Sequence, residues 1–247
     1  MSTENLLITG ASSDIAADLI GGLMKGSKPP RVLAHYNRSQ ERIEQLRCEY
    51  GSSIVPLQAD LAVPEDLQRL IATVCSQTEG LHQIVHLAAL KLRLERFPQA
   101  DLASFESDLG VQVGAISRLL REFLPAMARC ASRTKLVFVL SSVTLGVPPK
   151  FMPFYTVVKY AQLGLMRALA AEYAGTSVDI NAVSPSMVET RFLSEVPAKA
   201  REISASQSPL RRNLKVGEVT RVIEFLLSPS SDHLSGVNLP VTGGAIY

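Results

Sequence analysis

Short hydrophobic runs rich in β-branched residues alternate with longer segments of helical period along the whole chain. The hydrophobic runs predict strands at 5–9, 31–36, 53–59, 83–89, 135–142, 179–184 and 236–241. The amphipathic segments between them predict helices near 13–25, 39–50, 64–78, 101–130, 153–174 and 216–228. Several strands are apolar on both faces, as in a sheet that helices cover on both sides. The alternation predicts a doubly wound, seven-stranded parallel α/β sheet with right-handed crossovers, a Rossmann fold.

The segment 185–215 is the least regular part of the chain, and it directly follows a predicted strand. Open α/β sheets bind their ligands beyond the carboxyl ends of the strands, so we expect this segment to form a substrate-binding lid. No Gly/Ser linker, low-complexity tract or repeat divides the sequence. We therefore predict a single domain over residues 1–247.

Composition argues against several classes of protein. The chain has 247 residues, 19% of them charged, with a formal net charge of +2, so it carries neither a strongly basic surface nor an acidic tail. The N-terminal sequence MSTENLLIT lacks the features of a secretory signal, and no stretch approaches the roughly 18 apolar residues of a membrane span. We expect a cytoplasmic protein that binds neither nucleic acid nor membrane.

Three cysteines, Cys48, Cys75 and Cys130, are widely spaced and odd in number. This pattern fits neither a disulfide framework nor a clustered metal site. We expect reduced thiols and no bound metal.

The turn after the first strand, TGASSDIAADLI, is suited to binding a pyrophosphate. Gly10 permits a tight turn, Ser12 and Ser13 can cap the following helix, and the N–H groups of its first turn attract an anion. The dinucleotide fingerprint has three glycines here, whereas this chain has Asp14 and Ala16 at the second and third positions. A carboxylate at Asp14 would repel a phosphate, so a capped turn without a ligand remains the alternative.

The tip of the second strand favours NADP(H) over NAD(H). An NAD-selective site would have Asp or Glu there, whereas this chain has Asn37, Arg38 and Ser39. Arg38 can pair with a 2′-phosphate, or it simply begins the solvated face of the next helix. Asp60 follows the third strand, where it can contact an adenine edge or cap the next helix.

Tyr155 and Lys159 lie four residues apart in FYTVVKYAQ, which places both side chains on one helical face. Ser142, at the end of the predicted strand 135–142, precedes the tyrosine by thirteen residues. The intervening loop is long enough to bring this serine back against the helix.

In these features the chain resembles the short-chain dehydrogenase/reductases over essentially its whole length. The matching features are the strand followed by TGASS, Asp60, Ser142, Tyr155-x-x-x-Lys159, NAVSPSMVET (181–190) and TGG (242–244). The resemblance implies reduction of a carbonyl with a nicotinamide cofactor. It also implies the following cofactor-binding residues: Gly10, Ser12, Ser13, Asp14, Ile15, Asn37, Arg38, Ser39, Asp60, Leu61, Ala88, Tyr155, Lys159, Pro185, Val188 and Thr190.

The chemistry explains why the reaction needs these residue types. An unperturbed phenol has a pKa near 10, so it is a reluctant proton donor at neutral pH. A lysine ammonium beside Tyr155 would lower that pKa, and it would also hold the ribose of the cofactor. Tyr155 would then act as the general acid in reduction, while Ser142 stabilises the developing charge on the carbonyl oxygen.

Two positions depart from the family pattern. The family's asparagine, which helps hold a proton-relay water near the lysine, is absent from 101–130, and Gln112 takes its place. Gln112 either preserves the relay or is a polar residue at a helix bend. The family motif NNAG reads HLAA here, and we interpret His86 as a structural residue that braces the sheet.

Within the family, the chain is most similar to 3-oxoacyl-carrier-protein reductases. An acidic carrier protein could be steered by Arg118, Arg121, Arg129, Arg211 and Arg212, or these residues serve only solubility. Other small ketones or alcohols remain open as substrates. A non-catalytic, cofactor-binding scaffold is the competing hypothesis. The family resemblance also implies a homo-oligomer, a tetramer or a dimer, built on the helices at 101–130 and 153–174.

Overall fold

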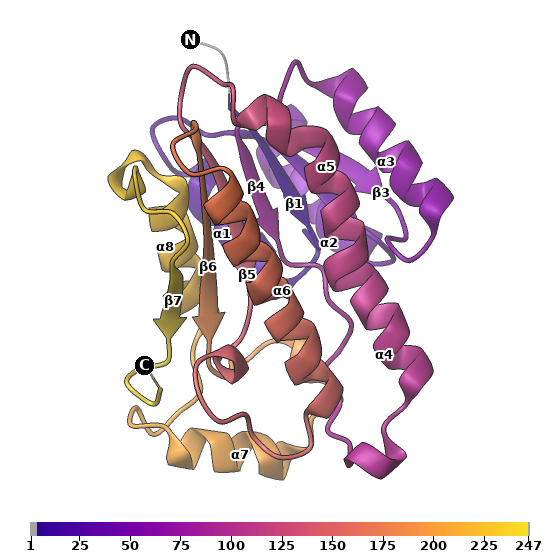
Figure 1. Ribbon diagram of the computed structural model, residues 1–247, viewed down its shortest axis with the longest axis vertical. Helices are drawn as coiled ribbons and strands as arrows, with labels where there is room; N and C mark the ends of the chain where they lie inside the picture. Colours follow the sequence, from indigo (N-terminus) through magenta and orange to yellow (C-terminus); the bar gives the residue numbers. More distant parts are fainter. Residues whose placement is uncertain (1–3, 247) are drawn as a thin grey trace.

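Seven parallel strands form one sheet in the order β3-β2-β1-β4-β5-β6-β7 in the computed structural model, which describes residues 4–246 (Figure 1). The order reverses between β1 and β4, which creates the crevice where doubly wound sheets bind ligands. The strands are β1 (Asn5–Thr9), β2 (Arg31–Tyr36), β3 (Ile54–Gln58), β4 (Gln83–His86), β5 (Thr134–Val139), β6 (Val178–Pro185) and β7 (Asn238–Val241).

Helices cover both faces of the sheet, as the apolar strands predict. The helices are α1 (Asp14–Met24), α2 (Gln40–Tyr50), α3 (Pro64–Gln77), α4 (Leu102–Leu109), α5 (Ile116–Met127), α6 (Pro153–Glu172), α7 (Ala198–Gln207) and α8 (Val216–Leu227). One apolar core joins the sheet to α3, α5 and α6, and a second joins it to α1, α2 and α8. Figure 1 shows α5 and α6 together on one side of the strands.

The predicted fold class is confirmed, and the largest deviations of the strands lie at the carboxyl edge of the sheet, whereas β7 begins two residues later than predicted. β4 ends at His86 and β5 at Val139, each three residues before the predicted end, because the chain leaves the sheet there to form loops. The predicted helix 101–130 is divided by a π-helical turn, Gly110–Ala115, between α4 and α5. The segment 185–215 is more regular than expected, because it contains α7. No helix within residues 4–246 is long and apolar enough to cross a membrane.

The segment 185–215 lies at the carboxyl edge and is fastened at its base. Val188 and Leu214 form an isolated parallel bridge, in which the Leu214 N–H donates to the Met187 carbonyl at 2.9 Å. Figure 1 shows α7 crossing below the arrowheads of β6 and β7. The two ends of the segment are therefore bonded to each other directly beyond the strands.

Candidate active site

Lys159 projects from α6 into the carboxyl edge of the sheet, where it is 4% exposed. Its ammonium donates to Gln112 Oε1 at 2.7 Å, to Gln162 Oε1 at 3.0 Å and to the carbonyl oxygen of Val139 at 3.2 Å. All three acceptors are neutral. Burial lowers the pKa of Lys159 from 10.5 to about 8, and the Asp108 carboxylate opposes that shift.

The π-helical turn positions Gln112 to hold this ammonium. Gln112 is fully buried, and its Nε2 donates to Asp108 Oδ1 at 2.5 Å, one helical turn earlier. Its backbone oxygen accepts from Gln162 Nε2 at 2.9 Å and from His86 Nε2 at 3.2 Å. Gln112 is thus more than a polar residue at a bend, because it joins α6 to the strand end of β4.

His86 has the bracing geometry that the sequence predicts. Its Nδ1 accepts from the Thr9 hydroxyl at 2.7 Å, while Nε2 donates to the Gln112 carbonyl. Burial, reinforced by the nearby Lys159 charge, lowers the pKa of His86 to about 3. The imidazole is therefore neutral across physiological pH and links β1, β4 and the π turn.

Tyr155 lies one turn before Lys159, with its ring at the edge of a small apolar cluster. Leu92, Leu193 and Val196 form the buried part of this cluster. The ring of Phe192 approaches the tyrosine ring with a centroid distance of 6.5 Å. The phenol thus lies where an apolar wall from segment 185–215 meets α6.

The phenol pKa moves opposite to the sequence-based expectation. Burial raises the pKa of Tyr155 to about 12, a hydrogen bond with the Ser141 side chain opposes this, and the Asp108 charge adds to it. Lys159 Nζ lies 5.8 Å from the centroid of the tyrosine ring. Desolvation therefore outweighs the Ser141 hydrogen bond, and the phenol keeps its proton at neutral pH.

The serine beside the phenol is Ser141, one residue before the predicted Ser142. Strand β5 has already ended, and Ser141 caps the short turn Ser142–Thr144 by accepting from the Val143 N–H. Ser142 opens that turn and is partly buried. Sequence spacing alone missed Ser141, because choosing between adjacent serines depends on where the turn begins. The role of Ser142 at a carbonyl oxygen stays a prediction.

The turn between β1 and α1 is tight, as Gly10 predicts. Gly10 has a φ of +76°, and a Cβ there would lie 2.9 Å from the Ala88 backbone nitrogen. The Gly10 N–H donates to His35 Nδ1 at 3.2 Å, and His35 Nε2 donates to the Ala59 carbonyl at 3.1 Å. Burial lowers the pKa of His35 to about 4, so this neutral imidazole ties the ends of three strands together.

Asp14, which replaces the second glycine of the fingerprint, is neutralised by arginines. Arg191 donates its backbone N–H to Asp14 Oδ2 at 2.7 Å and its Nε to Oδ1 at 2.9 Å. Arg42 Nη2 donates to Oδ1 at 3.2 Å. Ser13 caps α1 by accepting from the Ala16 N–H. Sequence reasoning missed Arg191 because it lies 177 residues from Asp14.

The remaining predicted cofactor residues surround the same edge. Asn37, Arg38 and Ser39 are exposed beyond the end of β2. Asp60 does not cap α3: its carboxylate accepts from the Ala62 N–H at 3.0 Å, in the turn before that helix. Pro185 is the last residue of β6, and the other members of the set follow strand ends in the chain: Ile15, Leu61, Ala88, Val188 and Thr190.

Comparison with known proteins identifies the family to which the chain belongs. A family described as Enoyl-(Acyl carrier protein) reductase matches residues 30–245. The chain belongs to the short-chain dehydrogenase/reductase family. It is therefore an oxidoreductase by family, as the resemblance in sequence predicts.

The matches to known relatives cover nearly the whole chain. The acetoacetyl-CoA reductase of Allochromatium vinosum is 26% identical over 241 residues, covering 96% of each chain. The 3-ketoacyl-(acyl-carrier-protein) reductase from Brucella melitensis complexed with NADH has a TM-score of 0.87 at 22% identity, covering 98% of each chain. ElxO with NADP bound has a TM-score of 0.86 at 22% identity, covering 99% of each chain. At these identities the two solved structures establish the fold.

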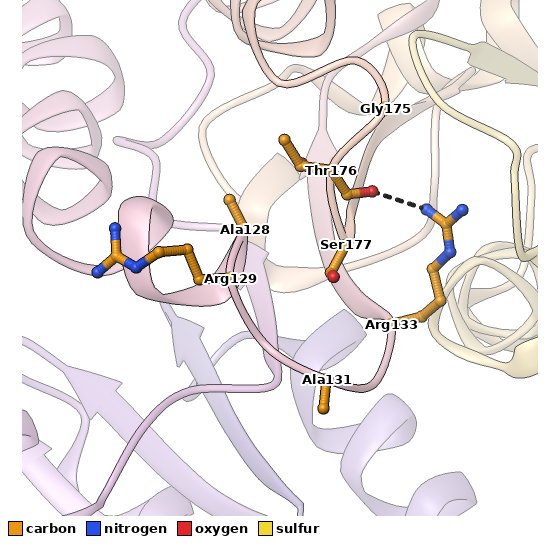
Figure 2. Close-up of a pocket in the computed structure, with 7 residues that line it drawn as sticks. All are labelled: Ala128, Arg129, Ala131, Arg133, Gly175, Thr176 and Ser177. Carbon is orange, nitrogen blue, oxygen red and sulfur yellow. Dashed lines mark hydrogen bonds between the residues drawn. The ribbon is translucent and has the colours of Figure 1, made fainter.

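The opposite edge of the sheet carries a polar cavity that belongs to a different region. It is an open hollow of about 520 Å³ between the loops that precede β5 and β6, lined by Ala128, Arg129, Ala131, Arg133, Gly175, Thr176 and Ser177 (Figure 2). Figure 2 shows the Arg133 guanidinium bonded to the Thr176 carbonyl, a 3.2 Å contact.

Arg129, which lines this hollow, lies at the amino edge of the sheet and cannot steer a substrate to Tyr155. Arg212, another of the proposed steering residues, forms an ion pair with Glu218 at 2.6 Å.

Proposed function

We propose that this protein is an NADPH-dependent ketoreductase that converts a carbonyl to a hydroxyl, with Tyr155 as the general acid. The observation that carries the proposal is the corner formed by the Tyr155 phenol, the Ser141 hydroxyl and the buried Lys159 ammonium. The phenol holds its proton at neutral pH, as reduction of a ketone requires. Oxidation of an alcohol would start from the phenolate. With a pKa of about 12, Tyr155 forms little phenolate at neutral pH.

The chain offers donors that fit NADP(H). Arg38, exposed at the end of β2, would pair with the 2′-phosphate, while Asn37 and Ser39 are neutral neighbours that do not repel it. The start of α1 and Thr190 would hold the pyrophosphate. Asp60 and Leu61 would flank the adenine, and Lys159 would hold the nicotinamide ribose. When bound, the cofactor supplies a hydride to the carbonyl carbon.

The protein side chains would manage the charge on the carbonyl oxygen. Tyr155 donates its proton to that oxygen, and Ser141 or Ser142 donates a hydrogen bond to it as negative charge develops. The phenolate left on Tyr155 is stabilised by the Lys159 ammonium, which contacts no carboxylate within residues 4–246. Gln112 and Gln162 fix the position of that ammonium.

We propose a 3-oxoacyl thioester as the substrate, free or bound to an acyl carrier protein. Leu92, Phe192, Leu193 and Val196 give the Tyr155 corner an apolar wall, which suits an acyl chain better than a sugar. The similarity to an acetoacetyl-CoA reductase supports the same class. The segment 185–215 would act as the lid. A cytoplasmic homotetramer or homodimer is part of this proposal.

Oxidation of NADPH in the presence of acetoacetyl-CoA tests the proposal. We expect turnover by the wild-type protein and a loss of about 10³-fold in kcat for Tyr155→Phe, because the proton donor is removed. Tyr160→Phe is the matched control, since Tyr160 lies on the same helix but is 43% exposed. Equal, negligible rates for wild type and Tyr155→Phe, despite tight NADPH binding, would favour the scaffold hypothesis. If the protein reduces other ketones but not acetoacetyl-CoA, the proposed substrate class is wrong and the proposed ketoreductase activity stands.

A further inference from the structure

Arg191 connects the start of the lid to the turn that lost its second glycine. It follows Thr190 in the short helical turn Arg191–Leu193. Besides its contacts with both Asp14 carboxylate oxygens, it donates Nη2 to the Ser12 carbonyl at 2.9 Å. In this clasp the backbone N–H of Arg191 holds one carboxylate oxygen and the guanidinium Nε holds the other, so the main chain and the side chain of Arg191 are both fixed to Asp14.

The clasp changes the local charge from negative to positive. Asp14 contributes one negative charge, whereas Arg191 and Arg42, both bonded to it, contribute two positive charges. The Asp14 side chain is 19% exposed, so its charge would be felt by a neighbouring anion if it were not paired. The three charges together leave a net +1 beside the first turn of α1.

The backbone of that turn does not itself require glycine at position 14. Within residues 4–246 the non-glycine residues with positive φ are Phe151, Arg211 and His233, so Asp14 is in an ordinary helical conformation. The turn also keeps donors for an anion. The N–H groups of a first helical turn have no partner within the helix, and Ser13 satisfies only that of Ala16. The carboxylate charge is thus the main obstacle to a phosphate.

We propose that Arg191 is a cofactor-positioning residue that cancels the Asp14 charge and so allows the altered turn to accept the pyrophosphate. This inference rests on the proposed function. The pair would replace the glycine of the fingerprint with an ion pair that also draws the beginning of the lid onto the pyrophosphate.

Calorimetric titration with NADPH and with adenosine 2′-monophosphate, which lacks the pyrophosphate, tests this role. For Arg191→Gln we expect NADPH to bind about 10- to 100-fold more weakly, the range for losing charge-assisted hydrogen bonds. Adenosine 2′-monophosphate should bind within about threefold of wild type, because it makes no contact that depends on Asp14. Asp14→Gly combined with Arg191→Gln should restore NADPH affinity to within about threefold of wild type.

A matched control separates this effect from loosening of the lid. Arg201→Gln removes another lid arginine, one that pairs with Glu189 at 3.8 Å and does not touch Asp14. It should leave NADPH affinity unchanged. If Arg191→Gln binds NADPH as tightly as wild type or more tightly, or the double variant is not restored, the inference is wrong while the proposed function stands. If wild type binds neither NADPH nor NADH, both are wrong.

Discussion

Two buried lysines at opposite edges of the sheet show how differently one side chain can be used. Lys159, at the carboxyl edge, is 4% exposed and donates only to neutral oxygens. Lys135, near the start of β5, is 3% exposed and pairs with Asp179 at 2.9 Å and Asp232 at 2.6 Å. Arg133 bonds the same Asp179 at 3.0 Å.

The difference lies in charge compensation. At the amino edge each buried charge has an opposite partner, so the cluster locks β5, β6 and the loop before β7 together. At the carboxyl edge the ammonium bonds to no carboxylate within residues 4–246, and burial lowers its pKa to about 8 although the Asp108 charge opposes that shift. A buried charge without a counterion destabilises the fold and is available to a reacting group. We therefore assign stability to Lys135 and chemistry to Lys159.

The largest expected effect is on catalysis at Lys159. Lys159→Met should lower kcat for acetoacetyl-CoA by about 10³-fold, because the phenolate formed on Tyr155 loses its stabilising charge. The free energy of unfolding should stay within about 1.5 kcal/mol of wild type, since the lost hydrogen bonds are offset by removal of a buried charge. Steady-state kinetics and urea denaturation check the two parts. A variant that keeps its activity would remove Lys159 from the mechanism.

The second effect is on stability at Lys135. Lys135→Met should lower the free energy of unfolding by about 3 kcal/mol, because Asp232 loses its partner and buried Asp179 keeps only Arg133. The activity per folded molecule should not change. Urea denaturation checks this, with Lys28→Met as the control at an exposed lysine. Stability equal to that of the control would contradict a structural role for the amino-edge cluster.

The smallest effect is a shift in pH dependence at Asp108. Reduction needs the Lys159 ammonium, so activity of wild type should fall as pH rises through about 8. The Asp108 charge raises the pKa of both Lys159 and Tyr155, so Asp108→Asn should move this decline to lower pH. The pH profile of kcat/KM for both proteins measures the shift. A decline that stays in place or moves to higher pH would show that Asp108 does not support the ammonium.

Sequence reasoning predicted the parts of this molecule that depend on local pattern. Hydrophobic runs gave all seven strands, and the four-residue spacing placed Tyr155 and Lys159 on one face of α6. The raised pKa of Tyr155 was not predictable, because desolvation depends on the apolar wall that segment 185–215 brings to it. The π turn at Gln112 likewise has no signal in residue type, since it is stabilised by His86 and Gln162 from elsewhere.

Nitrogen-detected NMR titration of the lysine side chains most directly tests whether burial without a directly bonded carboxylate lowers the pKa of Lys159. The measurement follows the Nζ resonances of the ligand-free protein between pH 6 and about 11, a range that spans the ordinary lysine pKa, and Lys159→Met and Lys135→Met assign the two buried groups. The account predicts that the Lys159 resonance titrates with a pKa of about 8. A Lys159 ammonium that remains protonated up to its ordinary value of 10.5 would contradict it.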